Sequence, residues 1–244
     1  MRGNYLKNSS LENGSEKNMK RDLLESCLIL REEGNAINGE QYFPVFVLLT
    51  HTGTILSNII KDVTKVPYSH SSISFDSSLK NMYSFGRKYK NNPLIGMFVK
   101  ENIQAGLYAD VAEKATFSLY VTFVSLKEKG AMEEKLSYFL DNKDKFKYNF
   151  IGLIKNKMGK TSNRDDAYFC SQFVDTVLKA GKSYFNKDSS LVRPYDFARN
   201  KQFQFVMKGT LIHYNSGTVD IRVKTLMDKF IASNQPVIKL TKRG

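Results

Sequence analysis

The sequence predicts one α+β domain in which an antiparallel sheet packs against helices. The chain has 244 residues, of which 41% are hydrophobic and 25% charged, the composition of an ordinary globular protein. This length suits one substantial domain with its own core, with or without tails. Stretches with strand alternation and stretches with helical spacing are interspersed along the chain, with no internal repeat, and this mixed order is typical of an α+β protein.

The N-terminal part begins with a polar segment. Residues 1–20 are rich in Asn, Ser, Lys and Glu, and we expect a flexible tail there. Leucines and an isoleucine then recur at helical spacing from Arg21 to Arg31. Phe43–Thr50 is a short apolar run typical of a buried strand, and Thr54–Val63 places its isoleucines on one helical face.

A β-hairpin follows Pro67. The segment His70–Asp76 alternates small polar with apolar residues, and Met82–Phe85 is a second short strand. The residues between them are typical of a turn, so we pair the two strands.

The second half of the chain alternates strands and helices, and its strongest strand pattern is Thr116–Leu126. The elements expected after it are an amphipathic helix at Gly130–Leu140, a short helix at Phe150–Ile154, a helix at Tyr168–Ala180 capped by Gly181, short strands at Phe203–Met207 and Thr210–Tyr214, and a last helix at Val219–Ala232. We divide the chain into the tail at 1–20, a domain at 21–215, and a C-terminal helix with a basic tail at 216–244.

Charge and hydropathy limit the expected location and binding partners of the protein. No apolar run approaches the roughly 20 residues that a membrane-spanning helix needs. The first residues lack the apolar core of a secretory signal, so we expect a cytoplasmic or virion-associated location. The net charge is +13, with lysines spread over the whole chain. This spread favours general attraction to anionic polymers over specific binding of nucleic acid.

The two cysteines are too few for a disulfide framework. Cys27 lies in the apolar segment LLESCLIL and is interpreted as a small core residue. Cys170 lies in the first turn of the helix expected at Tyr168–Ala180, on the same side as Phe173 and Val174. The positive end of a helix dipole favours the thiolate form there, although by spacing alone an inert core cysteine is the commoner use.

A nucleophilic cysteine needs a base, and the chain offers three histidines, His51, His70 and His213. His70 opens a predicted strand, which would hold an imidazole rigidly. His51 precedes a loop and a helix, where it would cap the helix or bind substrate. His213 lies downstream of the cysteine in a predicted strand. The residues alone leave His70 and His213 both open as the base.

Three segments carry a resemblance to a known family. The cysteine helix and its approach, KYNFIGLIKNK…AYFCSQFVDTVLKAG, resemble the YiiX-like, circularly permuted branch of the NlpC-type papain-like fold. The upstream segment LLTHTGTILSNIIKDVTKVPYSHSSISFD and the downstream segment SSLVRPYDFARNKQFQFVMKGTL are similar to that branch as well. The resemblance covers residues 44–211, the core of the domain. It implies a permuted papain-like fold, with the sheet packed against the helix that carries the nucleophile.

The resemblance also implies a catalytic set, with Cys170 as nucleophile and His70 as base. The residue that orients the imidazole falls on Ser84, where relatives have His, Glu, Asn or Gln. A serine is a weak orienting group, and Asp76, Asn81 and Glu101 are within reach as substitutes. A family tyrosine near the oxyanion site corresponds to Tyr148 or Tyr168. Further candidates for contact with the substrate or the oxyanion are Ser171, His51 and Glu101.

The implied function is that of a cysteine peptidase or amidase, a thiol protease in the broad sense. It would hydrolyse an amide or isopeptide bond, in peptidoglycan for example, or a lipid amide or ester. Lecithin–retinol acyltransferase-like relatives share the permuted layout, so acyl transfer is open as well. We expect substrate specificity to lie in cleft loops at Lys88–Ala115 and Lys155–Asp166.

The sequence contains none of the common cofactor motifs and leaves two alternative functions open. We expect no cofactor and no metal, because the sequence lacks HExxH, CxxC, a zinc-spaced cluster and a phosphate-binding loop. One alternative is a catalytically degraded papain-like fold that serves as a structural or binding protein in a larger assembly, such as a phage particle. A nucleic-acid binder is the third hypothesis, and it rests on charge alone.

Overall fold

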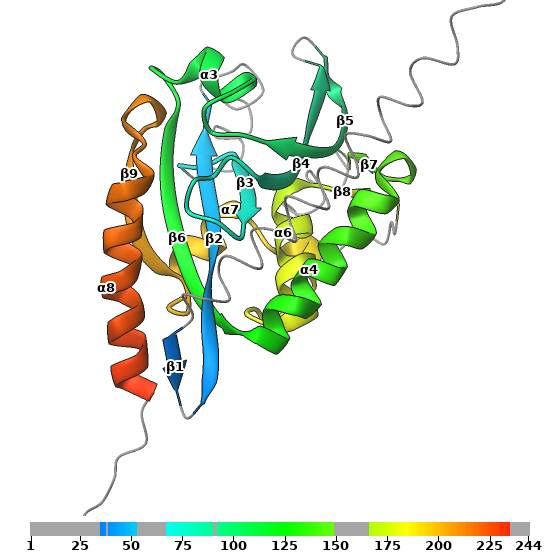
Figure 1. Ribbon diagram of the computed structural model, residues 1–244. Coiled ribbons are helices and arrows are strands. Elements are labelled where there is room, and N and C mark those ends of the chain that lie inside the picture. Colours follow the sequence, from blue (N-terminus) through cyan, green and yellow to red (C-terminus); the bar gives the residue numbers. More distant parts are fainter. Residues whose placement is uncertain (1–34, 38, 53–66, 90–91, 149–165, 235–244) are drawn as a thin grey trace, which may run out of the picture.

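An antiparallel sheet forms the centre of the protein (Figure 1). The computed structural model describes residues 35–37, 39–52, 67–89, 92–148 and 166–234. Within these residues seven strands form one sheet in the order β5-β4-β3-β2-β6-β9, with β1 also paired to β2. The strands are β1 (Asn35–Ile37), β2 (Glu40–His51), β3 (His70–Ser74), β4 (Met82–Tyr89), β5 (Asn92–Glu101), β6 (Thr116–Ser125) and β9 (Gln204–Thr210). The structure thus confirms an α+β fold with an antiparallel sheet packed against helices.

The helices lie on both faces of this sheet (Figure 1). They are α3 (Leu107–Val111), α4 (Leu126–Asp141), α6 (Cys170–Gly181), α7 (Pro194–Arg199) and α8 (Ser216–Asn234). Short 3₁₀ turns are η1 (Lys143–Lys145), η2 (Ser189–Leu191) and η3 (Leu211–His213). A small parallel pair, β7 (Lys147–Tyr148) and β8 (Ala167–Tyr168), leads into α6.

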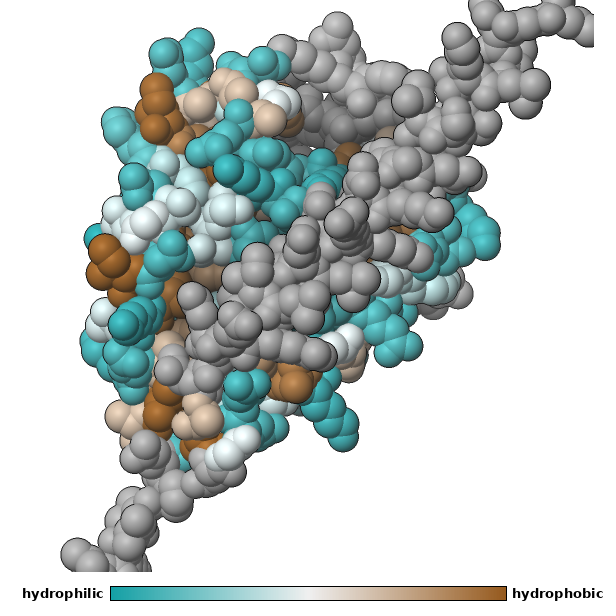
Figure 2. Space-filling model, viewed as in Figure 1, coloured by the Kyte–Doolittle hydropathy of each residue, from teal (hydrophilic) through white to brown (hydrophobic). Residues whose placement is uncertain are grey.

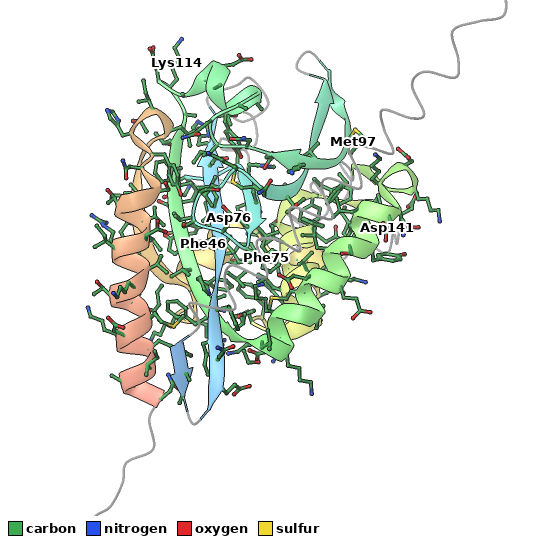
Figure 3. The ribbon with its side chains drawn as sticks, viewed as in Figure 1. Phe46, Phe75, Asp76, Met97, Lys114 and Asp141 are labelled. Atoms are coloured by element: carbon green, nitrogen blue, oxygen red, sulfur yellow. The ribbon has the colours of Figure 1, made fainter. Side chains whose placement is uncertain are left out.

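Two hydrophobic clusters form on opposite faces of the sheet because side chains alternate along a strand. In β2, Val45 and Val47 pack with residues of α4, α6 and α7. Their neighbours Phe46 and Leu48 pack with residues of α3 and α8. Figure 3 labels one residue of each cluster: Phe75 belongs to the cluster with α4, α6 and α7, and Phe46 to the cluster with α3 and α8. This arrangement buries β2 on both faces, as its continuous apolar sequence predicts.

A capping box fixes the start of α4. The Ser125 hydroxyl accepts from the Glu128 N–H at 3.3 Å, and the Glu128 carboxylate accepts from the Ser125 N–H at 2.8 Å. These bonds satisfy two backbone donors that a helix start otherwise leaves free. The helix therefore begins at Leu126, earlier than the apolar pattern from Gly130 predicts.

Gly181 allows α6 to lie close to α4. A Cβ atom at this position would come within 2.2 Å of the Glu128 carbonyl oxygen and 2.9 Å of Met132 Cε. The prediction of a capping glycine is wrong, because Gly181 is the last helical residue and Lys182 is the cap. The glycine is needed for the close approach of two backbones.

Two other predictions need correction. The strand predicted at Thr210–Tyr214 is instead the 3₁₀ turn η3, because β9 ends where its partner β6 begins, at the pair Thr116–Thr210. The loop predicted at Lys88–Ala115 contains β5 and α3. The tail at 1–20, Cys27, the helices predicted at 21–31, 54–63 and 150–154, the loop at 155–165 and the basic end from 235 lie outside the described residues.

The surface mixes hydrophilic and hydrophobic residues. Figure 2 shows hydrophobic spots in brown among teal residues on the face that it presents. Large hydrophobic side chains exposed in the described part include Ile221 of α8, Ile212 of η3 and Phe205 of β9. None of the described helices is long and apolar enough to cross a membrane.

Candidate active site

Cys170 is the first residue of α6 and is buried, with 3% of its surface exposed. Phe169 precedes it in extended conformation, and its carbonyl accepts the hydrogen bond of the Phe173 N–H, four residues further on, at 3.0 Å. The backbone N–H groups just before Phe173 thus point out of the helix start. They and the helix dipole favour negative charge on the Cys170 sulfur.

The helix start is held in place by packing and by one buried hydrogen bond. Phe173, Val174 and Val177 are fully buried in the cluster between α6, α4 and the sheet. The Ser171 hydroxyl donates to the Val192 carbonyl at 2.7 Å, which ties the first turn of α6 to the segment between η2 and α7. Ser171 is fully buried and engaged in this bond, so it serves to position the helix and does not stand free as an oxyanion donor.

His70 is the first residue of β3, and its side chain contacts groups from two other elements. His70 Nε2 lies 2.9 Å from Oε1 of Glu101, the last residue of β5. The two side chains are only 19% and 15% exposed. His70 also interacts with the side chain of Cys170, and this interaction shifts the pKa of both groups. With Nε2 engaged by Glu101, Nδ1 is the ring nitrogen left to face the sulfur.

Cys170, His70 and Glu101 form the trio of the candidate site. Their electrostatics favour an ion pair between Cys170 and His70. Burial works to lower the pKa of His70, but the Glu101 charge, followed by the hydrogen bond to Cys170, outweighs it and raises the pKa to about 10. Burial works to raise the pKa of Cys170, but the hydrogen bond and charge of His70, and then contacts with Ser71, lower it overall. Both shifts therefore favour the thiolate–imidazolium form of the pair.

Glu101 is held by a second contact. Its Oε2 accepts the hydroxyl hydrogen of Ser72 at 2.5 Å. Ser72 is buried in β3, two residues after His70. Both oxygens of the carboxylate therefore have a partner, one on His70 and one on Ser72.

Ser84 does not occupy the place that the sequence predicts for it. It is fully buried, and its hydroxyl hydrogen goes to the Ser71 carbonyl at 2.7 Å, which joins β4 to β3 where their backbone ladder has ended. Glu101, one of the three substitutes that the sequence offers, contacts the imidazole instead. The other substitutes serve the turn after β3: Asp76 accepts from the Ser78 N–H at 2.9 Å, and the Asn81 carbonyl accepts from Ser74 at 3.1 Å.

The remaining candidates whose side chains the structure describes have other surroundings. The Tyr168 ring packs against Phe85, Phe139 and Phe146, with centroids 5.1 to 5.7 Å away. His213 is exposed in η3. His51 ends β2 opposite Thr116, and strand alternation places it on the face opposite to that of Thr50. The side chain of Tyr148 lies outside the described residues.

Tyr108 belongs to the surroundings of the trio, although no pattern in the sequence indicates it. It lies in α3 with 3% of its surface exposed, and its hydroxyl oxygen is 3.4 Å from Thr50 Oγ1. Thr50 pairs with His70 across β2 and β3. Burial, and next the charge of Glu101, raise the pKa of Tyr108 well above its usual value, so the hydroxyl keeps its proton. Tyr108 is therefore a neutral hydrogen-bond donor beside Glu101.

The described residues contain no group of three or more His, Cys, Asp or Glu side chains suited to a metal ion. Fold and site together define an α+β protein with a Cys–His–Glu constellation at the start of a buried helix. A scan against protein-family models finds no match for the chain, and a search of curated proteins finds none either.

Proposed function

We propose that this protein is a cysteine hydrolase of the permuted papain-like type, which cleaves an amide or isopeptide bond through an acyl-enzyme. One observation carries the proposal: the His70 side chain lies between Glu101 and Cys170, and Cys170 stands at the start of a helix. A nucleophile, a base and a group that orients the base are the parts that covalent acyl transfer needs.

The order of these residues along the chain supports the permuted type. In papain-like enzymes the cysteine helix usually precedes the strand with the histidine. Here His70 comes first, Glu101 next and Cys170 last. Glu101 is one of the residue types that relatives of the permuted branch use to orient the imidazole, which removes the objection that Ser84 raises.

The reaction begins with attack of the Cys170 thiolate on the carbonyl carbon of the substrate. A carbon–sulfur bond forms, and the carbonyl oxygen takes the negative charge. The backbone N–H of Cys170 and one side-chain donor would stabilise this oxyanion. The intermediate collapses when the bond to the leaving amine breaks and the His70 imidazolium gives the amine its proton.

Water completes the cycle. Neutral His70 takes a proton from a water molecule, whose oxygen attacks the thioester carbon. The carbon–sulfur bond then breaks, the carboxylic acid leaves, and the thiolate–imidazolium pair is restored. If an acceptor alcohol or amine attacks in place of water, the same steps give acyl transfer. The substrate class is a peptide or isopeptide of peptidoglycan, or a lipid amide or ester.

The first test measures the alkylation rate of Cys170 by iodoacetamide against pH, in a Cys27→Ala background. His70→Ala and His213→Ala are compared with this background. Fast alkylation well below the reference pKa of about 8.5, lost only in His70→Ala, supports the proposal. Loss only in His213→Ala would keep the enzyme class and refute the permuted pairing.

A second test looks for the acyl-enzyme itself. The protein is incubated with peptidoglycan fragments, or with lipid amides and esters, quenched in acid, and digested for mass spectrometry. An acyl group on the Cys170 peptide, absent after His70→Ala, is the expected result. A slow thiol in every variant, with no acyl group from any substrate, would favour the degraded fold that serves as a scaffold.

A further inference from the structure

The pair Ser72 and Tyr108 lies behind the carboxylate that contacts His70. Ser72 Oγ gives its hydrogen to Glu101 Oε2 at 2.5 Å. A hydroxyl has one hydrogen and two lone pairs, so Ser72 Oγ remains an acceptor. The Tyr108 side chain lies close enough to Ser72 for Ser72 to influence its pKa, and its hydroxyl oxygen is 3.4 Å from Thr50 Oγ1. The Tyr108 hydroxyl can therefore donate to Ser72 while Ser72 donates to Glu101.

This chain of contacts is almost fully enclosed. Ser72 is 1% exposed, Tyr108 3% and Thr50 0%. Hydrogen bonds in such surroundings polarise one another, and the Glu101 carboxylate, with only 15% of its side chain exposed, depends on its protein donors more than a fully solvated one does. The chain of contacts begins on α3, crosses β3 and ends at the imidazole, so it adds α3 to the elements β3, β5 and α6 that carry His70, Glu101 and Cys170.

We propose that Ser72 and Tyr108 are positioning residues that keep the Glu101 carboxylate aimed at His70. The inference rests on the proposed function in one respect, that the His70 imidazolium serves Cys170. Among the described residues, the titratable groups that face His70 are Glu101 from β5 and Cys170 from α6, and Tyr108 from α3 reaches it through Ser72 and Glu101.

The physical consequence concerns the proton on His70. If Ser72 loses its hydroxyl, the carboxylate loses the donor to its Oε2 and is free to turn away from the imidazole. An opposite charge within a few ångströms stabilises an imidazolium, and this stabilisation falls when the charge moves or takes up a proton. Removal of the Tyr108 hydroxyl acts in the same direction through Ser72. Neither residue touches the sulfur or the substrate in this scheme.

The test measures the pKa of each histidine by nuclear magnetic resonance on the full chain, through the ring Cε1–H signals. The chain has only three histidines, so His51 and His213 serve as internal references. The variants are Ser72→Ala and Tyr108→Phe, with Glu101→Gln as the positive reference. We expect the pKa of His70 to fall by about one unit in each of these three variants. Ser72→Thr keeps a hydroxyl at this position and should leave the pKa of His70 at its original value.

Matched controls separate positioning from general packing. Ser74→Ala removes a buried hydroxyl two residues further along the same strand, where it bonds to Asp76 and Asn81 carbonyls. Tyr184→Phe removes a buried tyrosine hydroxyl that accepts from Thr122 at 3.1 Å, beyond the far end of α6. Both controls should leave the pKa of His70 unchanged. If either test variant fails to fold, the other decides.

An unchanged pKa of His70 in Ser72→Ala and Tyr108→Phe, with a lowered value in Glu101→Gln, would overturn the inference. So would an unchanged value in Glu101→Gln. These results are distinct from a failure of the proposed function. A slow, unacylated Cys170 with a His70 pKa that depends on Ser72 and Tyr108 would refute the hydrolase and keep the positioning role.

Discussion

His70 Nε2 lies 2.9 Å from Glu101 Oε1, although 31 residues separate them in the sequence. The contact joins the first residue of β3 to the last residue of β5, across β4 in the strand order. It gives the imidazole a fixed orientation with its other nitrogen toward Cys170. The same contact makes Glu101, and not Ser84, the orienting residue to test.

Glu101→Gln should lower the rate of acyl transfer by about 10²-fold or more, since it removes the charge that stabilises the imidazolium. Ser84→Ala should change the rate by little and lower the free energy of unfolding by about 1 kcal/mol, because it removes a hydroxyl that bonds to backbone carbonyls, mainly that of Ser71. Steady-state kinetics and urea unfolding on both variants check this. The reverse pattern would return the orienting role to Ser84.

The pH dependence of Cys170 alkylation follows from the direction of its pKa shift. Because the pKa is lowered, Cys170 has a larger thiolate fraction at a given pH than an ordinary cysteine, and this fraction falls as the pH drops through the lowered pKa. In His70→Ala the burial of the thiol remains while its cation is gone, so the pKa rises above the reference of about 8.5. Alkylation at neutral pH should then fall by about tenfold or more and recover in alkaline solution. An unchanged profile would show that His70 does not act on the sulfur.

Gly181→Ala should destabilise the protein by about 2–3 kcal/mol, because the new methyl group meets the Glu128 carbonyl and α4 must move away from α6. Gly130→Ala is the matched control. It lies in the exposed part of α4 with nothing within 4 Å of a new Cβ, and should stabilise the protein by up to about 1 kcal/mol. Thermal or urea unfolding measures both, and equal effects would contradict the close approach.

Ser171→Ala should lower the free energy of unfolding by about 1–3 kcal/mol, because the buried Val192 carbonyl loses its donor. Thr176→Ala tests the same helix at a hydroxyl that bonds to the Gln172 carbonyl within α6, and should change stability by only a few tenths of a kcal/mol. Urea unfolding distinguishes the two. If Ser171→Ala were as mild as its control, the bond to Val192 would not anchor the start of α6.

The main strands can be predicted because burial leaves a periodic pattern in the sequence. β2 is apolar on both faces, β6 alternates apolar residues with mostly polar ones, and the hairpin of β3 and β4 has the residues of a turn between its strands. The helix α6 has a clear apolar face, and this pattern is enough to place Cys170 in the first turn. In contrast, the sequence of β5 predicts a loop, because NPLIGMFVKE mixes Pro, Gly and charged residues at the edge of the sheet.

By itself the sequence determined the α+β class, most elements and the residue types for cysteine chemistry, because each depends on local periodicity or on the few cysteines and histidines present. Tertiary structure alone decided that Glu101 faces His70, that Ser84 bonds to a strand backbone, that Tyr108 lies behind Ser72, and that Gly181 permits two helices to touch. The physical reason is that these contacts depend on the register of distant strands and on the approach of separate backbones. No local pattern of side chains encodes either of them.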